Sequence, residues 1–145
     1  MIYLKVVTFN IGDGEYALDI NYIESVVDML PITRVPEAPH EVEGIINLRG
    51  EVMPLINSSK LLGVESRAES KGKIIILNYK NRKFGFLVDE IREVIDVSEE
   101  DVEPVDERIG VGGRYIDGII KRKDKLVILL KPSLASEEVF STGVG

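Results

Sequence analysis

Hydrophobic positions along this chain come in short runs separated by glycine, proline and charged residues, a pattern typical of a mainly β protein. The most distinct run is Val42–Ile56, VEGIINLRGEVMPLI, in which two apolar segments flank the polar tip Asn47–Glu51. Such segments predict a β-hairpin, in which Gly50 supplies a positive φ at the tip. Arg49 then stands at an exposed corner. Its guanidinium either binds a carboxylate or backbone oxygens of a partner or is a solvated turn residue, and the hairpin alone favours the second role.

The N-terminal pattern predicts a second hairpin followed by a short helical turn. Ile2–Asn10 and Tyr16–Ile20 are the expected strands, joined by a glycine-containing turn. Asn21–Glu24 has the spacing of a capping box, in which Asn21 accepts from the backbone and Glu24 reaches back to it. One helical turn is therefore expected between the second strand and the next extended segment.

Two further helical signals follow the later apolar runs. Ser59–Leu62 is expected to be helical and to stop at Gly63, with Asn57 or Ser59 as its cap. Pro132 is acceptable at a first helical position, so Ser133–Ala135 is a second candidate helix. The tail Glu138–Gly145 is small and polar at its end and is expected to fray.

The second half of the sequence repeats the first. Residues 16–28, YALDINYIESVVD, align without a gap with residues 84–96, FGFLVDEIREVID. The hairpin at 42–56 aligns with residues 116–130, IDGIIKRKDKLVILL. Apolar positions keep the same phase in both blocks, which matters because a slip of one residue would turn them to the opposite face of a strand.

The repeat predicts one domain, residues 1–145, with two β lobes at approximately 12–64 and 80–136. The polar segment Glu65–Lys73 is the expected link, and Lys73–Tyr79 is an expected strand buried on both faces. Pairing of the N-terminal strand across the lobes is compatible with these bounds. About five short strands per lobe are enough to close a small barrel.

Charge and composition argue against several classes of function. The net charge of −7 argues against nucleic-acid binding and against attachment to an anionic membrane. The chain has no cysteine, no long apolar run and no signal-like N-terminus, so we expect a cytoplasmic protein without direct membrane contact. His40 is the only histidine, which with no cysteine supplies few ligands for a metal site. Neither Ser58 nor the glycine-rich segments have the partners of a nucleophile or a phosphate loop, so we expect no catalytic residues, no metal and no cofactor.

Two segments carry a family resemblance. Ile32–Pro36, ITRVP, followed by Glu43–Gly50, EGIINLRG, resembles CheW-type chemotaxis coupling proteins, and the similarity extends over about residues 3 to 136. The resemblance implies two intertwined five-stranded β-barrels of SH3-like shape with a few short helices. It also implies a non-catalytic adaptor that joins the cytoplasmic tip of methyl-accepting chemoreceptors to the regulatory domain of the histidine kinase CheA.

The resemblance further implies a receptor-binding groove between the lobes. Its residues here are Val7, Ile20, Ile23, Glu24, Asn47, Arg49 and Ile91. The repeat independently makes Ile23 and Ile91 equivalent, whereas Val7 and Ile20 could equally be core residues. Glu24 is expected to pair with Arg49 or with a receptor side chain.

One segment departs from the family pattern. Where the family often has Asp-Leu-Arg after the central hairpin, this chain has Asn57-Ser58-Ser59. A local change in the first helix is therefore expected. The alternative function is a double-barrel module that binds peptides or small molecules in another signalling system.

Overall fold

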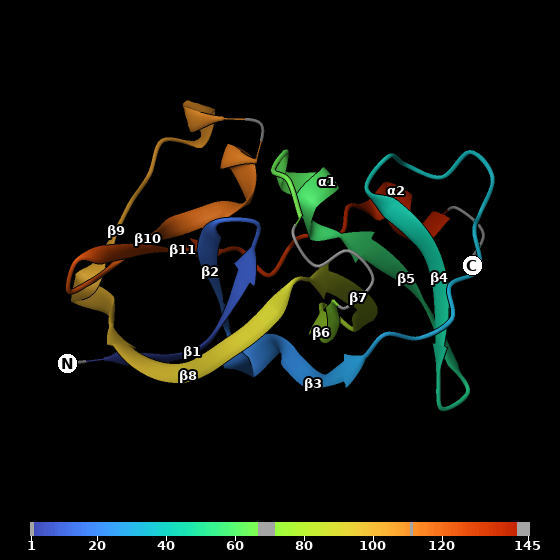
Figure 1. Ribbon diagram of the computed structural model, residues 1–145, viewed down its shortest axis with the longest axis horizontal. Coiled ribbons are helices and arrows are strands. Elements are labelled where there is room, and N and C mark those ends of the chain that lie inside the picture. Colours follow the sequence, from blue (N-terminus) through green and yellow to red (C-terminus); the bar gives the residue numbers. More distant parts are fainter. Residues whose placement is uncertain (1, 67–71, 111, 142–145) are drawn as a thin grey trace.

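The computed structural model describes residues 2–66, 72–110 and 112–141 and shows two sheets side by side, with sheet A on the left of Figure 1 and sheet B on the right. Sheet A contains β1 (Tyr3–Ile11), β2 (Gly14–Asp19), β8 (Glu90–Ser98), β9 (Val102–Glu103), β10 (Ile116–Arg122) and β11 (Lys125–Leu130). Sheet B contains β3 (Ile23–Asp28), β4 (Val42–Leu48), β5 (Glu51–Asn57), β6 (Lys73–Tyr79) and β7 (Arg82–Val88). The short helices are α1 (Ser58–Leu62), α2 (Glu137–Ser141), η1 (Ile20–Tyr22), η2 (Glu99–Asp101), η3 (Glu107–Ile109) and η4 (Gly113–Tyr115). The predicted mainly β fold with a few short helices is confirmed.

The two sheets have the same strand order and exchange hairpins. Sheet B runs β3-β6-β7-β5-β4, and sheet A runs β8-β1-β2-β11-β10 with the two-residue β9 added at the edge. In each sheet one pair is parallel, β5 with β7 and β2 with β11. Hairpin β1–β2 therefore joins strands from the second half of the chain, and hairpin β6–β7 joins strands from the first half. This exchange is what makes the predicted barrels intertwined.

The residues that form each sheet do not coincide with the expected lobes at 12–64 and 80–136. Strand β2 belongs to sheet A, although β3, β4 and β5 of the same repeat unit belong to sheet B. Similarly, β7 lies in sheet B and the strands that follow it lie in sheet A. The repeat is therefore a repeat of sequence order, and each sheet draws on both copies.

Three apolar clusters form the core. One lies within sheet A, around Val6, Ile120 and Val127, and one lies within sheet B, around Ile46 and Met53. The largest lies between the sheets and takes residues from both, including Phe9 of β1 and Phe86 of β7, whose rings meet edge-on with centroids 6.2 Å apart. We call this cluster the shared core. Because both sheets bury side chains in it, neither lobe has a complete core of its own.

Strand β6, which lies between β3 and β7, contributes side chains to two of the three clusters. Its residues Ile74 and Ile76 face the cluster within sheet B, and Ile75 and Leu77 face the shared core. Alternation along a strand sends successive side chains to opposite faces, so a continuous apolar run is buried on both sides. The prediction of a doubly buried strand is confirmed.

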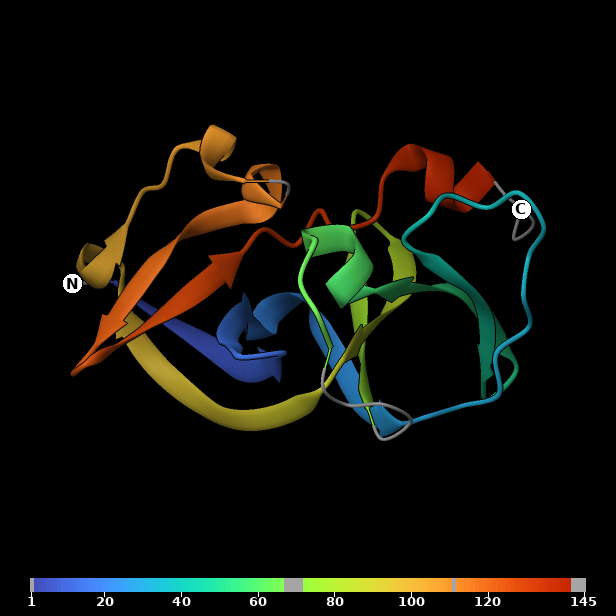
Figure 2. The same ribbon diagram turned by 45° about the horizontal axis from the view of Figure 1, so that its top comes forward.

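The structure corrects two predicted helices. The cap of η1 is Asp19, whose side chain accepts from the backbone N–H of Asn21, so Asn21 is not the cap and no capping box forms with Glu24. The C-terminal helix is α2, not Ser133–Ala135. It lies against sheet B, as both ribbon views show (Figures 1 and 2). Val139 is fully buried there, and Phe140 packs edge-on against Phe84.

Some expectations fall outside the described residues. The part of the link at 67–71 and the tail at 142–145 cannot be compared, as is also true of residue 111 in the glycine-rich loop. The described part of the tail is ordered into α2, contrary to the expected fraying from Glu138 onward. Packing of Val139 and Phe140 against the body of the protein outweighs the polar composition of the segment.

Candidate functional site

The apolar residues predicted for the groove lie where the two sheets meet. Ile23 is the first residue of β3 and pairs with Leu77, whereas Ile91 lies near the start of β8 and pairs with Phe9. Both are partly buried against the shared core. Strands β3 and β8 are edge strands that begin near the centre of the molecule and run outward into opposite lobes along the same side (Figures 1 and 2). The two isoleucines are thus related by the repeat in space as well as in sequence.

Val7 and Ile20 differ in how much surface they offer. Val7 is only 6 % exposed, because it lies on the central strand β1 between Leu18 and Val94. Ile20 begins η1, which packs against β1 and β6, and is half-buried. Val7 therefore lies beneath the surface of the predicted groove and offers little surface for contact with a partner.

Two exposed valines, which the sequence analysis did not place in the site, lie on the same edge strands. Val26 of β3 is 41 % exposed and Val94 of β8 is 54 % exposed. They occupy matching positions of the repeat, so the duplication supplied a signal that could have found them. We call Ile23, Val26, Ile91 and Val94 the edge-strand row.

The hairpin tip has the predicted form with an additional backbone feature. Arg49 and Gly50 both have positive φ, 53° and 88°, as a two-residue turn that follows the twist of its strands requires. Asn47 fixes the turn, because its Oδ1 accepts from the backbone N–H of Gly50 at 2.8 Å. Arg49 is exposed, and it makes no hydrogen bond or ion pair with any other described residue. Its guanidinium is therefore available to a partner.

Glu24 does not pair with Arg49, which corrects one expectation. Its Oε2 lies 3.2 Å from Nζ of Lys83, and its Oε1 accepts from Nδ2 of Asn78 at 3.2 Å. Lys83 also lies 3.0 Å from Oε2 of Glu51, the residue after the hairpin turn. These hydrogen bonds, first with Glu51 and then with Glu24, raise the pKa of Lys83. A polar row thus crosses sheet B from β3 to the hairpin.

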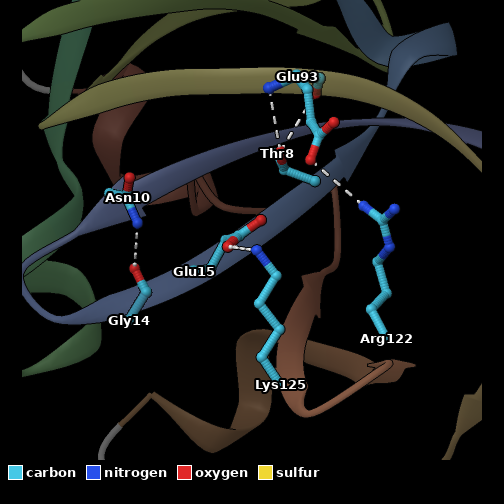
Figure 3. Close-up of polar contacts among 7 residues, drawn as sticks. All are labelled: Thr8, Asn10, Gly14, Glu15, Glu93, Arg122 and Lys125. Carbon is cyan, nitrogen blue, oxygen red and sulfur yellow. Dashed lines mark hydrogen bonds and ion pairs between the residues drawn. The ribbon is translucent and has the colours of Figure 1, made fainter.

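Sheet A has the corresponding polar row with the charges reversed. Nζ of Lys125 lies 3.0 Å from Oε1 of Glu15 (Figure 3), and the repeat places Lys125 and Glu15 where sheet B has Glu51 and Lys83, respectively. A second pair joins Arg122 and Glu93 at 3.4 Å. Thr8 fills the adjacent bulge between β1 and β8, where its hydroxyl accepts from the backbone N–H of Glu93 and donates to its carbonyl, both at 3.2 Å (Figure 3).

The departure at Asn57-Ser58-Ser59 is accommodated without loss of the helix. Asn57 caps α1, since its Oδ1 accepts from the backbone N–H groups of Ser59 and Lys60. Its Nδ2 donates to Oε1 of Glu43 at 2.7 Å, and Nζ of Lys60 lies 3.0 Å from the same oxygen. Burial alone would raise the pKa of Glu43, but these two partners outweigh it and hold that pKa below its usual value. The polar cluster therefore fixes α1 to β4.

The remaining observations concern metal-ligating side chains, cavities and membrane-spanning helices. Within the described ranges, no group of three or more histidine, cysteine, aspartate or glutamate side chains could hold a metal ion. A cavity of about 420 Å³ lies in sheet A, and its lining includes Leu4, Asp19, Tyr22 and Leu129. Asp19 and Tyr22 flank Ile20, but the cavity is bordered by neither Glu24 nor Arg49. No helix in the described part of the chain has the length and apolar character needed to cross a membrane.

The fold and these surfaces define a class: a mainly β protein of two intertwined SH3-like barrels that share a core. The sequence model of the CheW-like domain matches residues 5–139. The chain therefore belongs to the CheW-like domain family.

Individual relatives agree with that assignment. The chain is 37 % identical to the chemotaxis protein CheW of Treponema pallidum over 87 % of this chain and 78 % of that protein. It is 34 % identical to the chemotaxis protein CheW of Thermotoga maritima, over 93 % and 89 % of the two chains. The crystal structure of the scaffolding protein TtCheW from Thermoanaerobacter tengcongensis superposes with a TM-score of 0.83 at 37 % identity, covering 90 % of this chain and 86 % of that one.

Proposed function

We propose that this chain is a non-catalytic cytoplasmic adaptor in chemotaxis, which joins the cytoplasmic tip of a chemoreceptor to the regulatory domain of a CheA-type histidine kinase. The observation that carries the proposal is the arrangement of the edge-strand row and Arg49. Apolar side chains on two edge strands flank the seam between the sheets, and an unpaired guanidinium stands on a rigid turn. Exposed apolar patches of this kind mark interaction sites.

The receptor tip is proposed to lie along the seam. Ile23, Val26, Ile91 and Val94 then contact the apolar face of a helical segment, and the shared core behind Ile23 and Ile91 keeps that face rigid. Arg49 binds a carboxylate or backbone oxygens of the receptor from the side, since its fork of donors suits both. Asn47 contributes by fixing the turn that carries Arg49.

The adaptor acts by geometry in this proposal. It holds the receptor and the kinase in one assembly that is recruited to membrane-bound receptor arrays, so that a shift in the receptor biases the kinase between its states. An adaptor influences the kinase only through a difference in its contacts with those states. Neither nucleic acid nor direct contact with the membrane has a role.

The experiment mixes the purified protein with a receptor-tip fragment and a CheA-type kinase, and measures receptor affinity, ternary assembly and autophosphorylation. Arg49→Ala and Ile23→Asp should each weaken receptor binding by about tenfold while the protein stays folded. Lys123→Ala is the matched control, because Lys123 holds the position of Arg49 in the β10–β11 turn and has φ 52°. Full assembly and kinase activation by folded Arg49→Ala would remove its assigned role. Unchanged receptor affinity of folded Ile23→Asp would remove the seam as the receptor site.

A further inference from the structure

Lys83 occupies a junction between the two parts of the proposed receptor site. On one side, its Nζ lies 3.2 Å from the carboxylate of Glu24, the neighbour of Ile23 on β3. On the other side, it lies 3.0 and 3.1 Å from the two oxygens of Glu51. Glu51 follows the Arg49–Gly50 turn directly and pairs with Leu48 across the hairpin. A single ammonium group thus connects the edge strand to the base of the hairpin tip.

The junction has one positive and two negative side chains. The carboxylates of Glu24 and Glu51 both lie within 3.2 Å of Nζ of Lys83, so without the lysine they would repel one another, although Asn78 still donates a hydrogen bond to Glu24. The hairpin is the part that can move in response, because its tip projects beyond the body of sheet B (Figure 1). Removal of Lys83 should therefore displace or loosen the tip while leaving the buried core unchanged.

We propose that Lys83 is a positioning residue for receptor binding, which holds the Arg49 turn at a fixed place relative to the edge-strand row through Glu51 and Glu24. The proposal rests on the adaptor function above and deepens it. Lys83 need not touch the receptor itself. Its effect on affinity passes through Arg49, because the residue that it holds most closely adjoins the turn that carries this arginine.

The repeat supplies an internal control for a purely structural role. Glu15 and Lys125 form the equivalent ion pair of sheet A, 3.0 Å apart, beside the turn that holds Lys123 in place of Arg49. Both lysines close the polar end of a barrel. If Lys83 only stabilised the fold, Lys83→Met and Lys125→Met would affect receptor binding alike.

The first experiment measures the affinity of the full-length protein for a receptor-tip fragment by calorimetry at low and at high salt. Lys83→Met should weaken binding by about threefold to fivefold at low salt, the range for a partly exposed ion pair, and by less at high salt. Lys125→Met should leave the affinity within error of the wild type once its folded fraction has been verified. Equal affinities of wild type and Lys83→Met, or equal losses in both lysine variants, overturn the proposal.

A double-mutant cycle tests whether Lys83 acts through Arg49. In the Arg49→Ala background, Lys83→Met should cause little further loss, because the group that it positions is gone. Fully additive losses would show that Lys83 acts independently of Arg49 and would overturn the proposal. An inactive wild type, or a neutral Arg49→Ala, would instead contradict the adaptor function itself, and the positioning role would fall with it.

A measurement without any receptor tests the positioning role of Lys83 independently of the adaptor function. The backbone amide of Gly50 in free Lys83→Met should show a changed chemical shift and a lower order parameter, whereas Lys125→Met should leave that amide as in the wild type. An unchanged Gly50 amide in Lys83→Met would show that the lysine does not hold the turn, whatever the binding data.

Discussion

Sheets A and B repeat one design, and the comparison between them shows which features the design requires. Both have the same strand order, and even the register of the parallel pair is kept, with Leu129 opposite Ala17 in sheet A and Leu55 opposite Gly85 in sheet B. The ion pair at the polar end is kept in place but reversed in sign. Each sheet thus has an ion pair at this position, and the acidic and basic residues are exchanged between the two strands that supply it.

The two polar ends differ in how their charges are satisfied. In sheet B, Lys83 is shared between two carboxylates that are partly exposed. In sheet A, the side chain of Glu15 is only 11 % exposed, and its Oε2 is buried with no hydrogen-bond partner among the described residues. The position of Glu24 is taken in the second half by Arg92, which forms no ion pair with Glu15 or with any other described residue. The acidic group at the end of sheet A is thus nearly buried, whereas the acidic groups at the end of sheet B are partly exposed and adjoin the proposed receptor site.

The largest predicted effect concerns the shared core, which makes the two sheets unfold as one unit. Phe9→Ala should lower the free energy of unfolding by about 3–5 kcal/mol, because this fully buried ring contacts both Tyr16 of its own sheet and Phe86 of the other. Chemical denaturation followed by fluorescence and circular dichroism should still give one transition. Two separate transitions would mean that the sheets are independent units.

The equivalent glycines Gly44 and Gly118 provide the next test. Gly44 has φ 153°, and a Cβ there would lie 2.3 Å from the carbonyl oxygen of Thr33, so Gly44→Ala should cost about 3 kcal/mol. At Gly118 the φ is not positive, but a Cβ would lie 2.5 Å from a methyl carbon of Val102 and 2.9 Å from the carbonyl oxygen of Glu103, so β9 must shift and Gly118→Ala should cost about 2 kcal/mol. Thermal unfolding of both variants measures the difference. The opposite order of stabilities would contradict this account of the two edges.

The ion pair of sheet A should matter to stability although the side chain of Lys125 is 49 % exposed, because that of Glu15 is only 11 % exposed. Lys125→Met leaves the carboxylate of Glu15 buried without its cation, and should cost about 1–2 kcal/mol. The double variant with Glu15→Met should recover most of that loss, since the uncompensated charge is then gone. Equal stability of Lys125→Met and wild type would show that the pair contributes nothing.

The smallest expected effect is pH-dependent and concerns Glu43. Its pKa is lowered in the folded state, so its contribution is complete above the unfolded pKa of about 4.3 and disappears as the pH falls through the folded value. Glu43→Gln should cost about 1 kcal/mol at pH 7 and progressively less below pH 4. Asp117→Asn, at the equivalent exposed position of sheet A, is the control and should change little. A constant difference between wild type and Glu43→Gln across this range would contradict the shift.

Much of the local structure could be predicted from the sequence, because it depends on neighbouring residues. The central hairpin, the doubly buried β6 and the Asn57 cap follow from alternation, turn chemistry and capping. The exchange of hairpins could not be predicted in the same way. Alternation determines which face of a strand is buried, but it contains no information on which strand pairs with which.

The candidate site likewise has parts that could be predicted from the sequence and parts that depend on the strand pairing. Arg49 on its turn and the matched pair Ile23 and Ile91 could be predicted from the motif and the repeat. The partner of Glu24 could not, because Lys83 is distant in sequence and approaches only after the exchange brings β7 between β6 and β5. The repeat pairs Val26 with Val94, but their exposure could not be predicted from it, since a valine in a strand gives no sign of whether its edge is covered.

The hairpin exchange also sets an order for folding during synthesis. All strands of sheet B lie within residues 23–88, so that sheet can close while the rest of the chain is still in the ribosome. Hairpin β1–β2 emerges first, yet its neighbours β8 and β11 are both translated only after the last strand of sheet B. The apolar side chains of the nascent N-terminus therefore stay without their final neighbours throughout most of translation, and transiently exposed apolar surface of this kind is prone to aggregate.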